Sequence, residues 1–224
     1  MYRHVPNLIT ILRLLLTVVF FIILNINDVD SFSRQMWLGF IVFIVATLTD
    51  ILDGYLARKW KVESAFGRIV DPFVDKILIC GAFIFFSSNH FLAVPAKLNL
   101  FPKDQFVTGV EPWMVVVLVA REFLITSIRG LAEAQVVNFK ADWAGKIKMF
   151  TQSFAAGAVL VDLATVDQHR WVHVTRDLAI WITVVVTVLS SITYILRAWK
   201  IFSQPGAESR AGNGQPGAPG NGPG

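Results

Sequence analysis

Four aspartates in two short stretches are the residues best suited to chemistry in this sequence. Asp50 and Asp53 stand three residues apart, and Asp71 and Asp75 stand four apart. On a helix either spacing puts both side chains on one face, so each stretch presents a pair of carboxylates. Carboxylates gathered in a low-dielectric environment repel one another and take up protons unless cations lie between them.

Divalent metal ions are the partners that these residue types favour. Carboxylate oxygens with no His or Cys nearby favour Mg²⁺ or Mn²⁺ over Zn²⁺, and four carboxylates can hold two ions that also bind phosphate oxygens. Gly54 and Ala57 leave room for a ligand to approach the backbone, and the forked guanidinium of Arg58 can bind a phosphate. The pattern indicates a two-metal site for a phosphate-bearing substrate.

The segments around these residues are apolar enough to cross a lipid bilayer. Of the 224 residues 54% are hydrophobic and 16% are charged, with a mean hydropathy of +0.58, which water-soluble domains do not reach. A hydrocarbon core of about 30 Å needs about 20 apolar residues per helix. Six segments of that kind predict six membrane spans: Leu8–Leu24, Met36–Leu56, Ile69–Ser88, Pro112–Leu131, Gly145–Leu163 and His173–Trp199.

The expected architecture is therefore an all-α membrane protein. One membrane domain covers residues 1–202, and residues 203–224, rich in Gly, Pro, Ser, Ala and Asn, predict a disordered tail. The single Cys80 excludes a disulfide framework and a cysteine metal site. Despite the net charge of +4, no nucleic-acid partner is expected, because the basic residues are scattered between apolar spans.

The basic residues predict how the chain lies in the membrane. Short loops rich in Lys and Arg stay in the cytoplasm, and the loops Lys59–Arg68 and Arg129–Lys148 are richer in them than the intervening segments. We therefore expect a multi-pass protein of the cell (inner) membrane with both termini cytoplasmic. The second and third spans would run antiparallel across a short link, so all four aspartates would gather in a cytoplasmic active site.

The acidic stretches resemble the signature of the CDP-alcohol phosphotransferase family. All eight signature positions are present, as Asp50-x-x-Asp53-Gly54-x-x-Ala57-Arg58 and, after eight residues, Gly67-x-x-x-Asp71-x-x-x-Asp75. The resemblance implies a bundle of six transmembrane helices with a cytoplasm-facing polar cavity, often dimeric, so a homodimer is expected. It also implies a role for each signature residue: metal ligands at Asp50, Asp53, Asp71 and Asp75, with Asp75 also the general base, and contacts to the CDP-lipid from Asp53, Gly54, Ala57, Arg58 and Gly67.

Further stretches resemble the glycerol-phosphate branch of that family. They are Asn7-x-x-Thr10-x-x-Arg13, Asp71-Pro72-x-x-Asp75-Lys76, Ala120-Arg121-Glu122 and Gly145-Lys146-Ile147-Lys148. The resemblance implies transfer of the phosphatidyl group of CDP-diacylglycerol to glycerol 3-phosphate with release of CMP, and it adds Asn7 and Thr10 to the CDP-lipid contacts. The branch usually has Thr after the second lysine, whereas this chain has Met149 there and Thr151 two residues later.

An acceptor that carries a phosphate needs fixed cations near the metals. The basic residues available on the cytoplasmic half are Arg121, Arg129, Lys146 and Lys148. Arg121 and Glu122 could instead form no more than a buried ion pair, and the two lysines could only extend toward the headgroups. Similarly, Asp71 before Pro72 could be the N-cap of the third helix.

Two functional alternatives accompany this interpretation. The same chemistry could use another acceptor, namely inositol phosphate, phosphatidylglycerol or serine, because such relatives share the core signature. A divalent cation transporter would also gather aspartates within a membrane. Against a transporter, the aspartates lie at the inner interface rather than at the midplane, and no inverted repeat is visible in the sequence.

Overall fold

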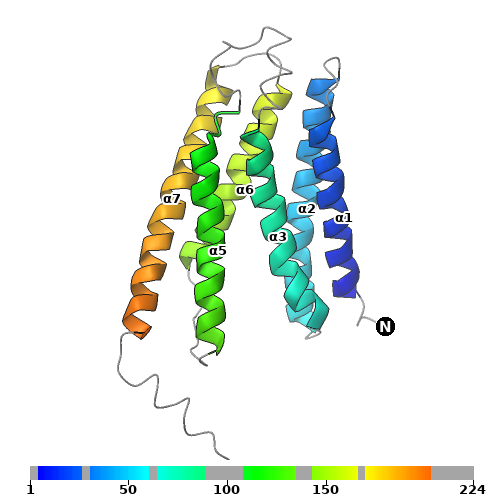
Figure 1. Cartoon of the computed structure of the whole chain (residues 1–224). Helices are drawn as coiled ribbons and strands as arrows, with labels where there is room; N and C mark the ends of the chain where they lie inside the picture. Colours follow the sequence, from blue (N-terminus) through cyan, green and yellow to red (C-terminus); the bar gives the residue numbers. More distant parts are fainter. Residues whose placement is uncertain are drawn as a thin grey trace, which may run out of the picture.

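Every regular element that the computed structural model describes is an α-helix (Figure 1). It describes residues 5–26, 31–60, 65–88, 108–134, 143–165 and 170–202, without the side chains of residues 5–7, 51–60, 65–72, 75, 133–134, 143–144, 146 and 200–202. The helices are α1 (Val5–Asn25), α2 (Phe32–Trp60), α3 (Ala65–Phe86), α5 (Pro112–Ala134), α6 (Trp143–Ala164) and α7 (Arg170–Phe202). The all-α prediction is confirmed, and the predicted tail lies outside the described residues.

Each helix lies where the sequence predicts a span, and each extends beyond the predicted apolar stretch on at least one side. α2, for example, runs from Phe32 to Trp60 around the predicted Met36–Leu56. A helix satisfies its backbone hydrogen bonds internally, so it can continue from the hydrocarbon into the headgroup region without a break. The apolar stretch therefore marks the membrane depth of a helix but not its ends.

The proposed N-cap role of Asp71 is wrong. α3 begins at Ala65, so Asp71 and Pro72 lie in its second turn rather than at its start. The upstream residues Ala65, Phe66, Arg68 and Ile69 can all adopt helical geometry, and they carry the helix back past the proline. Asp71 and Asp75 consequently belong to one continuous helix, as the four-residue spacing requires.

The outward faces of the bundle are apolar. Within the described residues, four helices are long and apolar enough to cross a bilayer, over Leu8–Asn25, Phe32–Asp50, Ile147–Ala164 and Arg170–Trp199, so the six-span count stays a prediction. α3 contributes a shorter apolar stretch, Lys76–Phe86. Large apolar side chains stand exposed on these faces, among them Leu8, Ile22, Leu38, Phe150 and Leu196. Such a continuous apolar surface is foreign to a water-soluble monomer and is what lipid solvates, so the chain is a multi-pass membrane protein.

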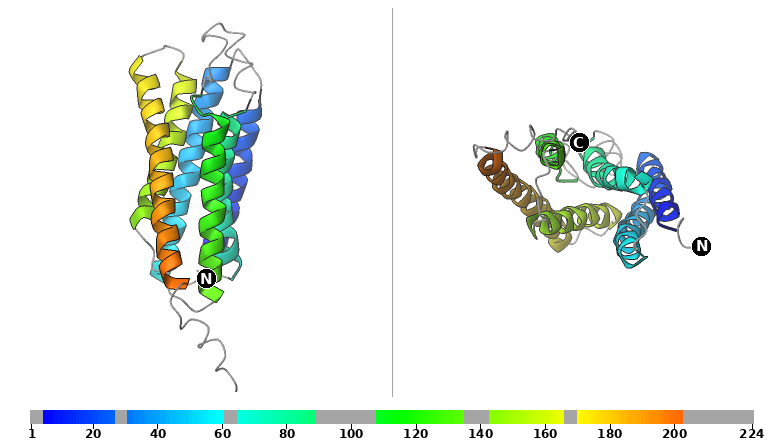
Figure 2. Two further views of the ribbon diagram at one scale, coloured as in Figure 1. Left: turned by 60° about the vertical axis from the view of Figure 1, so that its left-hand side comes forward. Right: turned by 90° about the horizontal axis from the view of Figure 1, so that it is seen from below.

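The helices close into a ring. α1 packs against α2 and α3, α2 against α6, α6 against α7, α7 against α5, and α5 back against α3, while α3 also reaches α6. Successive helices run antiparallel, so α1, α3 and α6 begin at the end where α2, α5 and α7 finish (Figures 1 and 2). We call this the acidic end, because the ends of α2 and α3 with the four aspartates lie there, and the opposite end the distal end.

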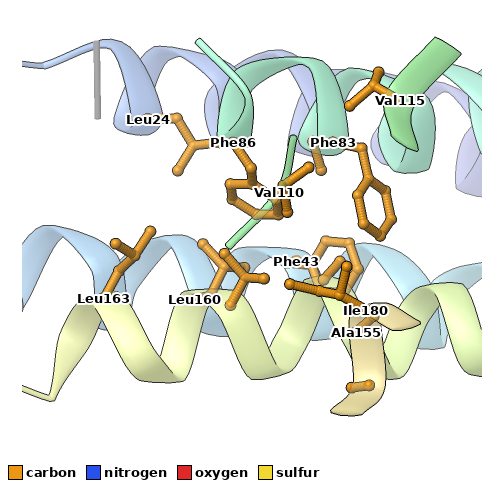
Figure 3. Packing of buried hydrophobic residues seen from close by; sticks show 14 of the residues in the cluster. Leu24, Phe43, Phe83, Phe86, Val110, Val115, Ala155, Leu160, Leu163 and Ile180 are labelled. Atoms are coloured by element: carbon orange, nitrogen blue, oxygen red, sulfur yellow. The ribbon is translucent and has the colours of Figure 1, made fainter. Parts of the chain in front are cut away.

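Apolar side chains fill the distal half of the ring. Phe43, Phe83, Leu160 and Ile180 converge from four helices (Figure 3). Aromatic rings reinforce this packing, since Phe21 stacks on Phe85 with ring centroids 5.3 Å apart. Such close packing fixes the spacing of the helices in the distal half, and with it the positions from which they enter the acidic half.

One ion-pair network crosses the distal end. The buried carboxylate of Asp162 on α6 contacts Arg176 at 2.5 Å and His173 at 2.7 Å, both on α7. Arg176 also contacts Asp177 at 2.8 Å. Gly109, with a φ of 68°, packs its Cα against this pair, where a Cβ would lie 2.9 Å from Asp177 Oδ1. The network ties α6, α7 and the segment before α5 together.

The distal packing predicts that Gly81→Ala lowers the melting temperature of the detergent-solubilised protein. An added Cβ at Gly81 would overlap the ring of Phe21, which is held by its stacking on Phe85. Overpacking of this kind costs about 1–3 kcal/mol. Gly130→Ala on α5 is the matched control, because nothing lies within 4 Å of its added Cβ, and it should be neutral or slightly stabilising. Equal melting temperatures for the two variants would contradict the packing described.

Candidate active site

Buried polar side chains gather in the middle of the bundle and toward its acidic end. They come from four helices: Thr10, Arg13 and Thr17 on α1, Arg121 and Glu122 on α5, Lys148 and Gln152 on α6, and Thr183, Thr187 and Ser190 on α7. Burying such groups within a membrane is costly unless they are paired or bind a ligand. Their concentration on this side of the apolar core makes it the candidate site.

The two acidic stretches are placed by α2 and α3. Asp50 and Asp53 lie in the second half of α2, and Asp71 and Asp75 lie in the first half of α3, so both pairs are in the half of the bundle toward the acidic end. α1 packs against both helices and links them. The side chains of Asp53, Asp71 and Asp75 lie outside the described residues. Among the side chains that the structure describes, no three acids, His or Cys form a metal-binding group, and the two-metal site stays a prediction.

Arg13 compensates the one aspartate whose side chain is described. Its Nη1 lies 2.8 Å from Asp50 Oδ1, with Arg13 fully buried and the Asp50 side chain 28% exposed. Thr17 donates a hydrogen bond to the Arg13 carbonyl at 2.8 Å, and Thr10 is buried one turn before Arg13 on the same helix. This face of α1 therefore presents a cation and hydroxyl groups toward the acidic helices.

The sequence pattern did not identify Arg13 as a site residue. It entered only as the last position of the N-terminal motif, with Asn7 and Thr10. The spacing of that motif could have indicated its role, because residues 7, 10 and 13 share one face of α1. The sequence pattern of α1 alone, however, does not show which acid on α2 this face contacts.

A second charged group, which we call the cationic cluster, consists of Arg121, Glu122 and Lys148. Arg121 Nη1 lies 3.0 Å from Glu122 Oε1, and Lys148 Nζ contacts the same oxygen. Arg121 Nη2 also reaches Ser190 Oγ on α7 at 3.5 Å. All three charged residues are buried, and among the described side chains two positive charges share one negative charge. Within the described residues the cluster therefore holds an excess of positive charge in a low-dielectric interior.

α3 connects the acidic stretches to this cluster. Lys76, the residue after Asp75, contacts Thr126 Oγ1 on α5. Thr126 in turn donates a hydrogen bond to the Glu122 carbonyl at 2.7 Å. The helix turn that carries Asp75 is thereby tied to the helix turn that carries Glu122. A substrate held by the aspartates and one held by the cationic cluster would meet at this junction.

Of the four cations predicted for the acceptor phosphate, the structure brings two together. Arg121 and Lys148 meet on Glu122, so the predicted Arg121–Glu122 ion pair is present and is joined by a lysine. Arg129 is exposed, two turns farther along α5. The side chain of Lys146 lies outside the described residues, as do those of Asn7, Gly54, Ala57, Arg58 and Gly67, whose predicted roles stay predictions.

Met149, which stands where the glycerol-phosphate branch usually has Thr, lies outside the cationic cluster. Met149 is 50% exposed on the outer face of α6, whereas Lys148 beside it points inward. Thr151 donates a hydrogen bond to the Lys148 carbonyl at 2.9 Å. A lipid-facing methionine at this position leaves the charged interior unchanged.

Comparison with known proteins decides the family. The profile of the family described as "CDP-alcohol phosphatidyltransferase" matches residues 3–189, which include the acidic stretches and the cationic cluster. The chain belongs to this family. As a phosphatidyltransferase it is an enzyme, and this favours catalysis over the alternative of a cation transporter.

Three curated relatives resemble this phosphatidyltransferase over most of its length. A CDP-diacylglycerol–glycerol-3-phosphate 3-phosphatidyltransferase of Bacillus subtilis (strain 168) is 31% identical over 88% of this chain and 96% of the relative. The protein of the same name from Rickettsia felis is 28% identical over 89% and 98%. A Mycobacterium tuberculosis protein named "Probable phosphatidylglycerophosphate synthase" is 30% identical over 87% and 81%.

The shared carboxylate of the cationic cluster predicts that Glu122→Gln destabilises this phosphatidyltransferase. The variant would leave Arg121 and Lys148 buried without their common counter-charge, which costs roughly 3–5 kcal/mol for a broken buried pair. Thermal unfolding in detergent should show a clear fall in melting temperature. Glu111→Gln is the control, because Glu111 is exposed beside Trp113 and should melt with the wild type. An unshifted Glu122→Gln variant would show that this carboxylate does not compensate the two cations.

Proposed function

We propose that this enzyme transfers the phosphatidyl group of CDP-diacylglycerol to glycerol 3-phosphate and releases phosphatidylglycerophosphate and CMP. The observation that carries the proposal is the cationic cluster, in which buried Arg121 and Lys148 outnumber Glu122 beside the acidic helices. A phosphate monoester is the acceptor group that supplies the missing negative charge. The names of the relatives support the glycerol 3-phosphate acceptor over inositol phosphate.

The charge of the cluster also argues against an acceptor without a phosphate. Serine has no phosphate, and it would leave a buried excess of positive charge uncompensated. In low dielectric an unmatched charge of this kind weakens binding instead of aiding it. Phosphatidylglycerol carries only a single phosphodiester charge, on the lipid side of its headgroup. Glycerol 3-phosphate brings a terminal group with up to two negative charges on a small, water-soluble carrier.

The aspartates fit a pair of Mg²⁺ or Mn²⁺ ions. Four carboxylates on two helices form a hard oxygen donor set, and the partly exposed Asp50 is open to a ligand even with Arg13 at its side. Asp50, Asp53, Asp71 and Asp75 would hold the ions. When bound, such ions neutralise the diphosphate of the CDP-lipid and increase the electrophilicity of its phosphorus.

The residues of the site bind and orient the two substrates, and one of them takes up a proton. Asn7, Thr10, Asp53, Gly54, Ala57, Arg58 and Gly67 would surround the CDP-lipid, and Arg121 and Lys148, with Arg129 and Lys146 nearer the acidic end, would hold the acceptor. Asp75 takes the proton from the acceptor hydroxyl as its oxygen attacks the lipid-side phosphorus. The bond between that phosphorus and the CMP oxygen breaks, and CMP leaves with the bonding electron pair. Most of the rate enhancement comes from positioning and charge neutralisation.

The placement in the membrane belongs to the same proposal. Six transmembrane helices would surround a polar cavity that opens at the acidic end, and the Lys and Arg of the adjoining loops support a cytoplasmic location for it. Both termini would then be cytoplasmic in an inner-membrane protein. The family resemblance further supports a homodimer.

An acceptor panel tests the proposed reaction. Purified protein in mixed micelles would be incubated with CDP-diacylglycerol and Mg²⁺ and with glycerol 3-phosphate, inositol phosphate, serine or phosphatidylglycerol, and CMP release would be measured. We expect rapid CMP release only with glycerol 3-phosphate and none after chelation of the metal. A lipid product formed only from another acceptor would overturn the assignment.

Asp75→Asn should abolish turnover while the protein still inserts and folds. Loss of a positioned general base lowers a rate by about 10²–10⁴-fold, and loss of a metal ligand lowers it further. The readouts are CMP release and the melting temperature in detergent. Asp177→Asn is the matched control, because Asp177 lies at the distal end, half-exposed in the Arg176 network. Activity of Asp75→Asn near that of the control would remove Asp75 from the mechanism.

A further inference from the structure

Three buried polar atoms beside the cationic cluster lack hydrogen-bond partners among the described residues. They are Arg121 Nε on α5, Gln152 Nε2 on α6 and Thr187 Oγ1 on α7. Gln152 is only 2% exposed and Thr187 is fully buried. A buried polar atom left unpaired costs about 1–3 kcal/mol, so each of these three groups would gain from a ligand that accepts its hydrogen bond.

A chain of hydrogen bonds places the residues that carry these atoms on neighbouring turns of three helices. Arg121 Nη2 donates to Ser190 Oγ at 3.5 Å, and Ser190 Oγ donates to the Thr187 carbonyl at 3.0 Å. One turn from Thr187, Thr183 donates to the carbonyl of Thr151 at 2.9 Å, which fixes α7 against α6 next to Gln152. The helices α5, α6 and α7 therefore converge here.

Gln152 stands one helical turn from Lys148, on the same face of α6. Because α6 runs away from the acidic end, Gln152 lies deeper in the bundle than Lys148. Beyond it the interior becomes apolar, with Ala155, Ala156 and Val159 fully buried. Gln152 is thus at the floor of the polar region, where the cationic cluster gives way to the hydrophobic core.

The unpaired groups match the chemistry of a phosphate monoester. An amide N–H, a guanidinium N–H and a hydroxyl can each donate to an oxygen, and the adjacent Arg121 and Lys148 supply the charge. A metal ion would be repelled by the two cations, and an apolar ligand would leave all three donors unsatisfied. A terminal phosphate has enough lone pairs to accept from all of them.

We propose that Gln152 and Thr187, with Arg121 Nε, form the floor of a phosphate-binding site and make the enzyme specific for phosphorylated acceptors. This inference rests on the proposed function, because it assigns the site to the phosphate of the acceptor. The cations of the cluster attract any anion. The neutral donors Gln152 and Thr187 would favour an acceptor whose terminal phosphate reaches them over an acceptor without one. Gln152 and Thr187 are accordingly specificity residues that bind the non-reacting end of the acceptor.

The test compares Gln152→Leu, Thr187→Val and Thr187→Ser with the wild type in steady-state kinetics. Losing one hydrogen bond to a charged ligand should raise KM for glycerol 3-phosphate about tenfold or more in the Leu and Val variants. The value of kcat at saturation and KM for CDP-diacylglycerol should stay within about twofold. Thr187→Ser keeps the hydroxyl and should restore the wild-type KM.

A second measurement reports on the site without turnover. Inorganic phosphate should raise the melting temperature of the wild-type protein in detergent and should do so much less in Gln152→Leu and Thr187→Val. Gln35→Leu is the matched control, since Gln35 is a buried glutamine at the distal end whose Nε2 donates to the Ile26 carbonyl. It should keep both the wild-type KM and the phosphate response.

The outcomes separate the two proposals. If glycerol 3-phosphate is no substrate of the wild type, the proposed function fails, and the response of the melting temperature to phosphate still decides whether the site binds phosphate. If glycerol 3-phosphate is a substrate but the Leu and Val variants keep its KM, or lose kcat alone, the assignment of the floor is overturned. Should Gln152→Leu not fold, the Thr187→Val and Thr187→Ser pair decides the question.

Discussion

Lipid offers neither counter-charge nor hydrogen bond, so each charge inside a membrane bundle must be compensated by the protein or by a ligand. In the described part of this enzyme that requirement joins helices that follow one another in the sequence. Arg13 on α1 meets Asp50 on α2, and Lys148 on α6 meets Glu122 on α5. The apolar packing of the distal half holds these helices at fixed spacing, and the charges select which faces turn inward. Removing one partner therefore disturbs the bundle as well as the site.

The two buried ion networks in the described part of the bundle differ in their balance of acidic and basic groups. At the distal end Asp162 and Asp177 face Arg176 and His173, so acids and bases are matched in number. In the cationic cluster Arg121 and Lys148 share a single acid, and polar atoms around them lack partners among the described residues. An unmatched charge among the described side chains makes the cationic cluster a candidate functional site, because perturbed charge is typical of such sites.

Much of this arrangement could be predicted from the sequence, and the missing part has one physical cause. The spacing of Asp71 and Asp75 predicted a shared helix face, and the apolar segments predicted where the described helices lie. The alternative that made Asp71 an N-cap is wrong, because α3 begins at Ala65, upstream even of the predicted start at Ile69. Periodicity describes one helix at a time, so it could not show that Arg13 pairs with Asp50, that Lys148 joins Glu122, or that Gln152 is left unpaired. Arg121 and Ser190, for instance, lie 69 residues apart in the chain and meet only through packing.

The proposed reaction brings together two anionic substrates, and their mutual repulsion explains why the polar half has two regions of different character. A diphosphate needs metal ions held by carboxylates, but carboxylates would repel the phosphate of the acceptor. Placing that phosphate against Arg121 and Lys148, with Glu122 limiting their charge, removes it from the acids without moving its hydroxyl out of reach. Lys76 and Thr126 keep the two regions in register, because they tie the turn after Asp75 to the carbonyl of Glu122. In the proposed reaction the acceptor would reach from the cationic cluster to the aspartates, so its length as well as its charge would decide which acceptors react.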